Sequence, residues 1–423
     1  RPPRSTLFPY TTLFRSPGNA AVAQAAPAAG AATSESPGIL GYYRYPALRD
    51  TVLVFVAEGD LWTVSATGGL ARRLTTHPGL EQRPAISPDG YWLAFSATYE
   101  GPTEVYVMPL AGGIPTRLTW EGDALVVGWT PDGRVLYSTS RYSTLPEMQL
   151  AMVAPPERPV GNGRPGVAAP PVRPTPPALI PLAQAADGVF SPDGRTLIFT
   201  RLPHQGSHTK RYMGGMAQQL WSWSVPEAGP TVALGAYGRN VLAALEGAEP
   251  LVVGGATVVA ASLRVEVGQP GARPAAARPQ ATPDPVVVTE ETTRRGGLAS
   301  APVTEARPLT ANYPGTSKQP MWWQGRVYFL TDRLTAEQPA DPRQAKAGVM
   351  NIWSMAPDGS GLRRHTSHED YDAQSPSLDP VRGRIAYQHG ADIRVLDLRT
   401  GEDRVLDIRL ASDFEQLRER WIE

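Results

Sequence analysis

Few residues of this 423-residue chain have the types and spacings that catalysis requires. The chain has no cysteine, which excludes disulfides, thiol nucleophiles and cysteine-ligated metals. It also lacks a Gly-x-Ser-x-Gly nucleophile elbow, a His-Glu-x-x-His zinc motif and a Gly-rich phosphate-binding loop. The sequence therefore predicts no catalytic residue, no metal site and no cofactor in this chain.

One histidine pair has the spacing of two metal ligands on a helix. His204 and His208 are four residues apart, which would place both imidazoles on one helical face. Gly206 lies between them and disfavours a helix, and fewer than three candidate ligands cluster there. We therefore expect a solvated loop rather than a metal site.

Five polar residues in two loops are candidates for binding a ligand. Lys210, Arg211 and Tyr212 could present positive charge and attract a peptide carboxylate. Arg141 and Tyr142 follow an apolar strand and could act in the same way. The alternative for both groups is ordinary loop charge in contact with water, and the residues alone leave this open.

The charge balance limits the classes of partner. Lys and Arg together number 40, as do Asp and Glu, whereas nucleic-acid binders usually carry a basic surface. Residues 241–265 are the most apolar stretch, but Glu246, Glu249, Pro250 and Arg264 interrupt it. A membrane span needs about 20 mostly apolar residues. We expect neither a nucleic-acid partner nor a membrane span.

A repeated sequence motif indicates the structural elements that must position these candidate residues. In each copy a polar residue, an aliphatic residue and usually an aromatic residue begin a strand. Several copies end alike, at Thr75, Thr119 and Thr366, and the first two threonines are about 44 residues apart, a spacing typical of a four-stranded blade. The copies are DLWTVS (60–65), EVYVMP (104–109), QLWSWS (219–224), NIWSMA (351–356), DIRVLD (392–397) and a degenerate EMQLAM (147–152).

Tight turns precede several copies of the motif. SPDG at 87–90 and 191–194, and TPDG at 130–133, combine a proline that sets φ, an aspartate that bonds its own backbone and a glycine that accepts positive φ. The following strands are apolar on both faces, as expected where neighbouring sheets cover both. The sequence thus predicts an all-β, six-bladed β-propeller of four-stranded antiparallel blades. The expected blades are roughly 42–76, 77–119, 120–182, 183–234, 307–366 and 367–410.

The expected propeller domain covers residues 40–410 and carries two long Pro/Ala-rich insertions, at about 155–178 and 235–306. Such compositions cannot bury enough apolar surface to order themselves. An apolar patch at 249–263 could pair as an extra hairpin. Tryptophans recur at blade positions, Trp62 among them, and we expect them in the core.

Both ends of the chain suggest a fragment of a longer protein. Residues 1–39 are expected to be an artefactual or disordered leader, since residues 1–16 resemble translated sequencing adapter. The Ala-rich residues 20–38 resemble the tail of a secretory signal peptide, or a linker without targeting meaning. At the other end, residues 411–423 read as a helix start with a capping box, and are expected to begin a linker.

On these motifs the chain resembles the N-terminal six-bladed propeller of the tricorn protease family, with TolB-like (PD40) repeats. The aspartate-containing hairpin, followed by D-[LIV]-[WY] and R-x-L-T, carries the broader likeness. The narrower likeness rests on KRYMGGMAQQLW (210–221), PMWWQGRVYFLTDR (320–333) and NIWSMAPDGSGLRRHTSHEDYDAQSPSLD (351–379). LASDFEQLRERW (410–421) is similar to the crossing into a second propeller.

The resemblance implies that the parent protein is a serine peptidase, a hydrolase acting in proteolysis, and that this chain is one module of it. It implies a homo-oligomer in which a second propeller, a PDZ domain and catalytic domains follow this one. This chain would filter or channel oligopeptides and would bear no catalytic residue. The family anchors peptide carboxyl ends with an arginine pair before the third hairpin. Here residues 119–127 carry Glu121 and Asp123 instead, which puts that anchoring role in doubt.

Two other functions stay open at this point: a stand-alone TolB-like protein-binding propeller, and the propeller of a prolyl-oligopeptidase-like hydrolase. A signal-peptide remnant would indicate a periplasmic or exported protein, whereas the tricorn resemblance implies the cytoplasm. In any of these functions the inner strand of each blade would line the tunnel. We expect residues 84–86, 125–129 and 319–322 on such strands.

Overall fold

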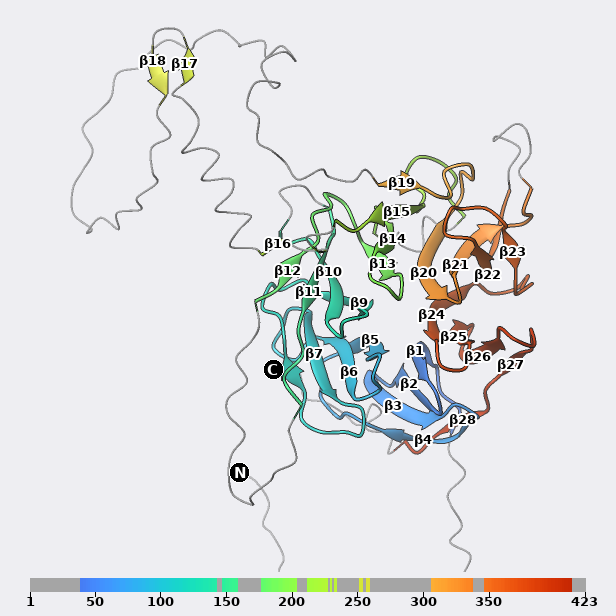
Figure 1. Cartoon of the computed structure of the whole chain (residues 1–423). Helices are drawn as coiled ribbons and strands as arrows, with labels where there is room; N and C mark the ends of the chain where they lie inside the picture. The colour runs from blue at the N-terminus through green and yellow to red at the C-terminus, as the bar shows by residue number, and fades with distance from the viewer. Residues whose placement is uncertain are drawn as a thin grey trace, which may run out of the picture. The chain divides into compact units, whose positions relative to one another are not determined.

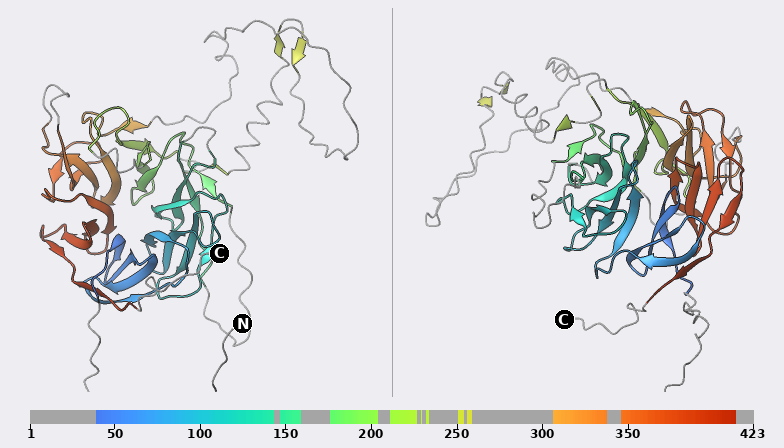
Figure 2. Two further views of the ribbon diagram at one scale, coloured as in Figure 1. Left: turned by 180° about the vertical axis from the view of Figure 1, so that it is seen from behind. Right: turned by 60° about the horizontal axis from the view of Figure 1, so that its bottom comes forward.

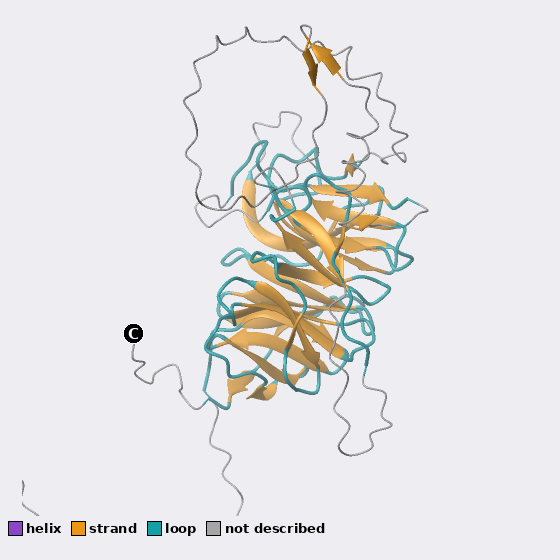
Figure 3. Cartoon of the chain, turned by 90° about the vertical axis from the view of Figure 1, so that its left-hand side faces the viewer, coloured by secondary structure: helices purple, strands orange, loops and turns teal. Residues whose placement is uncertain are grey.

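The described part of the chain is built from strands and turns. The computed structural model describes residues 39–142, 147–158, 176–203, 211–226, 229, 232–233, 251–253, 256–258, 306–337 and 346–412. Figure 3 shows strands and loops in these residues and no helix. Accordingly, none of them belongs to a helix of the length and apolarity that crossing a membrane requires. The predicted leader, most of both insertions and the predicted linker helix lie outside the described residues.

Six of the seven sheets formed by the described strands surround a common axis, so this unit is a six-bladed β-propeller (Figure 1). Within each blade the first four strands pair antiparallel, in chain order from the inside outward. Blade 1 consists of β1 (Arg44–Arg49), β2 (Val52–Ala57), β3 (Asp60–Ser65) and β4 (Gly69–Arg73). Blade 2 consists of β5 (Glu81–Ile86), β6 (Trp92–Ala97), β7 (Glu104–Pro109) and β8 (Thr116–Arg117). Blade 3 consists of β9 (Leu125–Trp129), β10 (Val135–Thr139), β11 (Gln149–Val153) and β12 (Ala178–Leu179). Blade 4 consists of β13 (Asp187–Phe190), β14 (Thr196–Thr200), β15 (Leu220–Ser224) and β19 (Arg307–Pro308). Blade 5 consists of β20 (Ser317–Trp323), β21 (Arg326–Arg333), β22 (Ala347–Met355) and β23 (Arg363–Arg364). Blade 6 consists of β24 (Ala373–Asp379), β25 (Arg384–His389), β26 (Asp392–Asp397) and β27 (Asp403–Val405).

The six inner strands close a ring at the centre. Each of β1, β5, β9, β13, β20 and β24 contacts the inner strands of both neighbouring blades, and the rotated views of Figure 2 show the same ring. The segments expected on inner strands, 84–86, 125–129 and 319–322, lie on β5, β9 and β20. The sequence therefore identified three of the strands that surround the axis.

Hydrophobic packing between neighbouring blades holds the ring together. Each of six buried clusters joins two adjacent sheets, and the cluster of Phe55 and Trp62 with Ala386 and Ile393 joins blade 1 to blade 6. Trp62 is fully buried, as predicted. Burial on both faces explains why the central strands of a blade are apolar throughout rather than alternating.

The predicted turn chemistry is present in the hairpins. In the first SPDG turn the Ser87 hydroxyl donates to Asp89 Oδ1 at 2.5 Å, and the Trp92 N–H donates to Ser87 Oγ at 2.9 Å. Gly90 has φ of 74°, a conformation that glycine adopts without a steric penalty. Ser191 and Asp193 repeat the first of these contacts at 2.5 Å. These turns therefore fix the length of the hairpin between the inner and second strands.

A threonine after the fourth strand ties the outer strands together in four blades. Its Oγ1 accepts the N–H of the aliphatic residue in the repeated motif at 2.9 Å, and donates to a nearby side-chain oxygen. The pairs are Leu61 with Thr75, Val105 with Thr119, Leu220 with Thr310 and Ile352 with Thr366. The receiving oxygens belong to Glu81, Glu104, Gln219 and Asn351. The last three open the repeated motif, so this bond, which we call the threonine clip, explains both its polar first residue and its final threonine.

Blade 4 differs from the expected boundaries. Its fourth strand is β19 (Arg307–Pro308), which had been expected to begin blade 5, so residues 225–306 fall between the third and fourth strands of one blade. The clip threonine Thr310 closes an RPLT segment, a copy of R-x-L-T that marks this strand in the sequence. The expected hairpin at 249–263 is present, as β17 (Leu251–Val253) pairs antiparallel with β18 (Ala256–Val258).

Additional strands extend two of the blades. β16 (Val232–Ala233) pairs with β12 in blade 3. β28 (Ile408–Leu410), expected in blade 6, instead pairs parallel with β4 of blade 1. Leu410 also exchanges two backbone hydrogen bonds with Ile39, of 3.1 and 2.8 Å. The two ends of the propeller are thus joined to each other at the outer edge of the first blade.

Replacing a clip threonine should destabilise the propeller. In Thr119→Val the buried Val105 N–H loses its acceptor, and Glu104 Oε2 loses a donor while Oε1 keeps those from Arg117 and Gly122, so we expect the free energy of unfolding to fall by roughly 2 kcal/mol. The matched control is Thr76→Val, at an exposed threonine, where we expect less than about 0.5 kcal/mol. Urea denaturation followed by tryptophan fluorescence measures both. Equal effects would show that the clip contributes nothing specific.

Candidate functional site

One face of the propeller collects the polar loops. Because the strands of a blade alternate in direction, the loops between second and third strands leave at the same face as the connections between blades. We call this the loop face. Arg141 and Tyr142 lie in its β10–β11 loop, and Arg211 and Tyr212 in its β14–β15 loop. Lys210 lies outside the described residues. The structure thus places four of the five predicted binding residues on one face, in two adjacent blades.

Tyr142 contacts the segment in which the family resemblance implies an anchoring arginine pair that this chain lacks. Its hydroxyl donates to Glu121 Oε1, and the Tyr137 hydroxyl donates to the same oxygen at 3.2 Å. Burial raises the pKa of both hydroxyls, and the Glu121 charge adds to this effect. Arg141 is exposed, and its Nη2 lies 3.3 Å from the position that a Cβ on Gly122 would occupy. A cation therefore stands beside the acidic 121–123 segment, supplied by the neighbouring loop.

Arg211 bridges two blades at the loop face. Its Nε donates to the Gly348 carbonyl on β22 at 3.3 Å, and its φ is 60°. Tyr212 is exposed to 38%. These two residues are on the opposite side of blade 4 from Arg141, so the two predicted groups do not form one cluster.

Four inner strands contain a proline-associated bulge that the sequence did not predict. At each bulge a non-glycine residue with positive φ precedes a proline, a strained conformation that often marks a functional site. The proline has no N–H to offer the ladder, which a bulge tolerates. The four dipeptides are Tyr45-Pro46, Arg83-Pro84, Gln319-Pro320 and Ser375-Pro376, with φ of 50°, 51°, 53° and 47° at the first residue. A proline inside each strand was the available sequence signal.

Charged residues on the inner strands of three blades influence one another electrostatically near these bulges. Arg83 on β5 and Lys318 on β20 both act electrostatically on Asp187 of β13, although Arg83 belongs to blade 2 and the others to blades 4 and 5. Arg83 acts from an inner strand that is adjacent to neither β13 nor β20 in the ring. The backbone N–H groups of Gly188 and the bulge residue Gln319 also hydrogen bond to the Asp187 carboxylate. The bulge of β20 thus directs a donor towards the neighbouring blade.

Burial shifts the pKa values of both an acidic and a basic residue of this group. Enclosure by protein atoms raises the pKa of Asp187 to about 6, against the opposing effect of Arg83, although part of its surface stays accessible to solvent. Burial likewise lowers the pKa of Lys318, while the charges of Asp372, Asp187 and Asp332 oppose this shift. Lys318 as a whole residue is only 8% exposed. We call Arg83, Asp187 and Lys318 the axial charge cluster.

A serine–histidine contact in blade 5 is structural rather than catalytic. Ser354 Oγ lies 2.8 Å from His365 Nε2 and accepts a hydrogen bond from Arg326 Nε at 3.1 Å. Ser354 is fully buried, so no substrate reaches it. Burial and the nearby Arg326 and Arg363 lower the pKa of His365, and no carboxylate bonds to its ring among the described residues. This pair therefore lacks the access and the orienting group of a nucleophile and its base.

The charge state of Asp187 should make stability depend on pH. Its carboxyl titrates near 4 in the unfolded chain and near 6 in the fold, so the fold favours the protonated form and loses stability as pH rises between these values. Asp187→Asn mimics the protonated form. We expect it to raise the free energy of unfolding at pH 8 by roughly 1–3 kcal/mol and to leave it unchanged at pH 4. Denaturation at the two pH values measures this difference, and a destabilised variant at pH 8 would contradict it.

Comparisons with known proteins assign the fold to a family. Residues 40–231 match the model of the family described as "Tricorn protease N-terminal beta propeller domain". Tricorn protease homolog 1 of Streptomyces coelicolor is 32% identical over 377 residues, which cover 88% of this chain and 25% of that protein. The tricorn protease homolog of Saccharolobus solfataricus is 22% identical over 387 residues, covering 90% and 26%.

A solved structure agrees with these sequence relatives in fold. The crystal structure of the tricorn protease aligns with 89% of this chain and 27% of its own, with a TM-score of 0.53 and 18% identity. This chain spans about a quarter of the length of the curated relatives it matches. With the matching family model and six four-stranded blades, the chain belongs to the tricorn protease N-terminal β-propeller family.

Proposed function

We propose that this propeller binds extended oligopeptides at its axis and channels them to or from the catalytic domain of a tricorn-like serine peptidase. The observation that carries the proposal is the axial charge cluster, in which Arg83, Asp187 and Lys318 lie on the inner strands of three blades and influence one another electrostatically. A peptide has a cationic amino end and an anionic carboxyl end, so a centre with both signs offers a partner for each. A ring of six inner strands would admit an extended chain and exclude a folded protein.

The loop face would be the side at which peptides first bind. Arg141 stands beside Gly122, in the segment where the resemblance expects an arginine pair but the sequence places acidic residues. We propose that Arg141 supplies the cation for a peptide carboxylate there, with Tyr142 holding the adjacent Glu121 in place. Lys210, Arg211 and Tyr212 would contribute charge and a hydroxyl at a second position on the same face.

The rest of the proposed peptidase lies in domains other than this one. The named relatives are about four times as long as the part that this chain matches. We propose that the propeller domain of residues 40–410 belongs to such a protein. There the serine nucleophile, a second propeller and a PDZ domain would be supplied by other parts of a homo-oligomeric protease. This chain would then bind peptides and cleave none.

Peptide binding tests the proposal directly. We expect a fluorescently labelled pentapeptide with a free carboxyl end to bind the protein, as measured by fluorescence anisotropy. Arg83→Gln removes a charge from the axial cluster and should weaken this binding about tenfold. The same peptide with an amidated carboxyl end should bind the unaltered protein and the variant about equally.

A matched variant guards against a general charge effect. Arg399 is exposed in the β26–β27 turn, at the face opposite the loop face, and Arg399→Gln changes the net charge equally. We expect it to leave peptide affinity unchanged. The proposal fails if no peptide binds, or if both variants weaken binding alike.

A further inference from the structure

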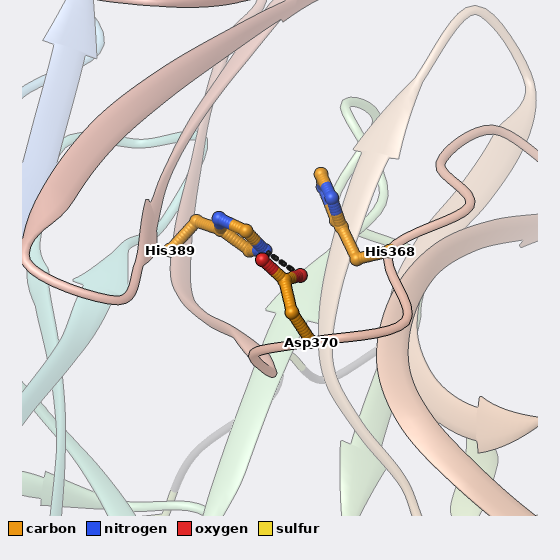
Figure 4. Close-up of side chains that lie close together, drawn as sticks. All are labelled: His368, Asp370 and His389. Atoms are coloured by element: carbon orange, nitrogen blue, oxygen red, sulfur yellow. Dashed lines mark hydrogen bonds and ion pairs between the residues drawn. The ribbon is translucent and has the colours of Figure 1, made fainter.

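Three potential metal ligands come together on the loop face of blade 6. His368 and Asp370 lie in the connection between β23 and β24, and His389 ends β25, 19 residues after Asp370. One ligand atom from each lies within 4.8 Å of the other two (Figure 4). The sequence predicted no metal site because these residues form no local motif, and only the return of β25 to the loop face brings them together.

The cluster combines two enclosed imidazoles with a carboxylate open to solvent. His389 Nε2 is 3.1 Å from Asp370 Oδ1, and the two imidazole centres are 4.0 Å apart. Each histidine side chain is 12% exposed, whereas that of Asp370 is 62% exposed. A cation could therefore enter from the Asp370 side, and water could complete its coordination there.

The hydrogen bonds around His368 determine which of its ring nitrogens has a lone pair available to bind a metal ion. The Tyr387 hydroxyl donates to Asp403 Oδ2 at 2.7 Å, and the same hydroxyl lies 2.8 Å from His368 Nε2. A phenol has one hydrogen, so His368 Nε2 must carry its own hydrogen and donate to the Tyr387 oxygen. This leaves a lone pair on Nδ1. Metal-bound histidines commonly donate their second ring N–H in this manner, through a partner that fixes tautomer and orientation.

The backbone that carries the ligands is also held in place. Asn351 Oδ1 accepts the His368 N–H at 2.8 Å, and Asn351 Nδ2 donates to the His368 carbonyl at 3.1 Å. Asn351 also receives the hydroxyl of the clip threonine Thr366. His389 belongs to the β25 ladder, where it pairs with Ala373 and with the first residue of β26. Two of the three ligands therefore project from positions with little freedom to move.

We propose that His368, Asp370 and His389 bind a divalent first-row transition-metal ion of the Zn²⁺ type. Two imidazoles and one carboxylate match the donors and number of an open zinc site, whereas Ca²⁺ and Mg²⁺ prefer oxygen ligands. Bond lengths of about 2.0–2.2 Å require the three ligand atoms to draw closer, and the exposed Asp370 has the most freedom to do so. The ion would fasten the β23–β24 connection to the end of β25.

Zinc titration of the full chain tests this site. We expect isothermal titration calorimetry with ZnCl₂ to show one site of micromolar affinity, and Mg²⁺ to bind far more weakly. His389→Ala and Asp370→Asn should each weaken Zn²⁺ affinity at least tenfold, because each removes a ligand. Co²⁺ should give visible absorption bands that these two variants lose, which reports on ligation independently of heat.

Two controls separate this site from other histidines. His77 follows Thr75 as His368 follows Thr366, but it stacks on Tyr99 with ring centroids 4.0 Å apart, so His77→Ala should leave Zn²⁺ affinity unchanged. The double variant His204→Gln/His208→Gln should also bind normally. The proposal is overturned if the unaltered chain binds no Zn²⁺, or if either control variant loses binding while His389→Ala keeps it. Circular dichroism confirms that each variant is folded.

Discussion

Every blade of this propeller is apolar on both faces, and that constraint determines the architecture. A sheet of this kind is stable only when another layer covers each face, and a ring of identical layers satisfies every member at once. The buried cluster between blades 6 and 1 is therefore as necessary as the five between consecutive blades. The added parallel strand β28 and the Ile39–Leu410 hydrogen bonds reinforce this closing contact from outside. The hydroxyl of Tyr43, which donates to the Ile408 carbonyl at 2.7 Å, ties the two ends of the ring together again.

Closing the ring concentrates polar groups in two places. The inner strands have no further strand to pair with, and their bulges direct backbone groups such as the Gln319 N–H towards the axis, where Asp187 accepts it. The loop face collects the connections between blades, so residues far apart in the chain, such as Arg211 and Gly348, come into contact there. Catalytic machinery is not needed for either place to bind a ligand. Both places are consequences of how the blades pack around the axis.

The sequence predicted the fold because its signals are local and repeated. Each SPDG or TPDG turn depends on residues two to five positions apart, and the threonine clip joins Val105 to Thr119 and Ile352 to Thr366 within a blade. The fourth strand of blade 4 was misplaced because a long stretch separates Leu220 from Thr310, although RPLT carried the same signal. The sequence did not predict the position of β28, because its parallel pairing with β4 produces no repeated sequence pattern.

The candidate sites also differ in whether local sequence signals or only the tertiary structure reveal them. The sequence by itself determined the all-β repeat, its turns, its buried tryptophans and the polar loops that hold Arg141 and Arg211, since these depend on near neighbours in the chain. Only the tertiary structure decided that Arg83, Asp187 and Lys318 act on one another, and that His389 lies beside Asp370. Those groups belong to different blades or to opposite ends of a hairpin unit. Their distances are set by how the sheets close around the axis, which no spacing along the chain encodes.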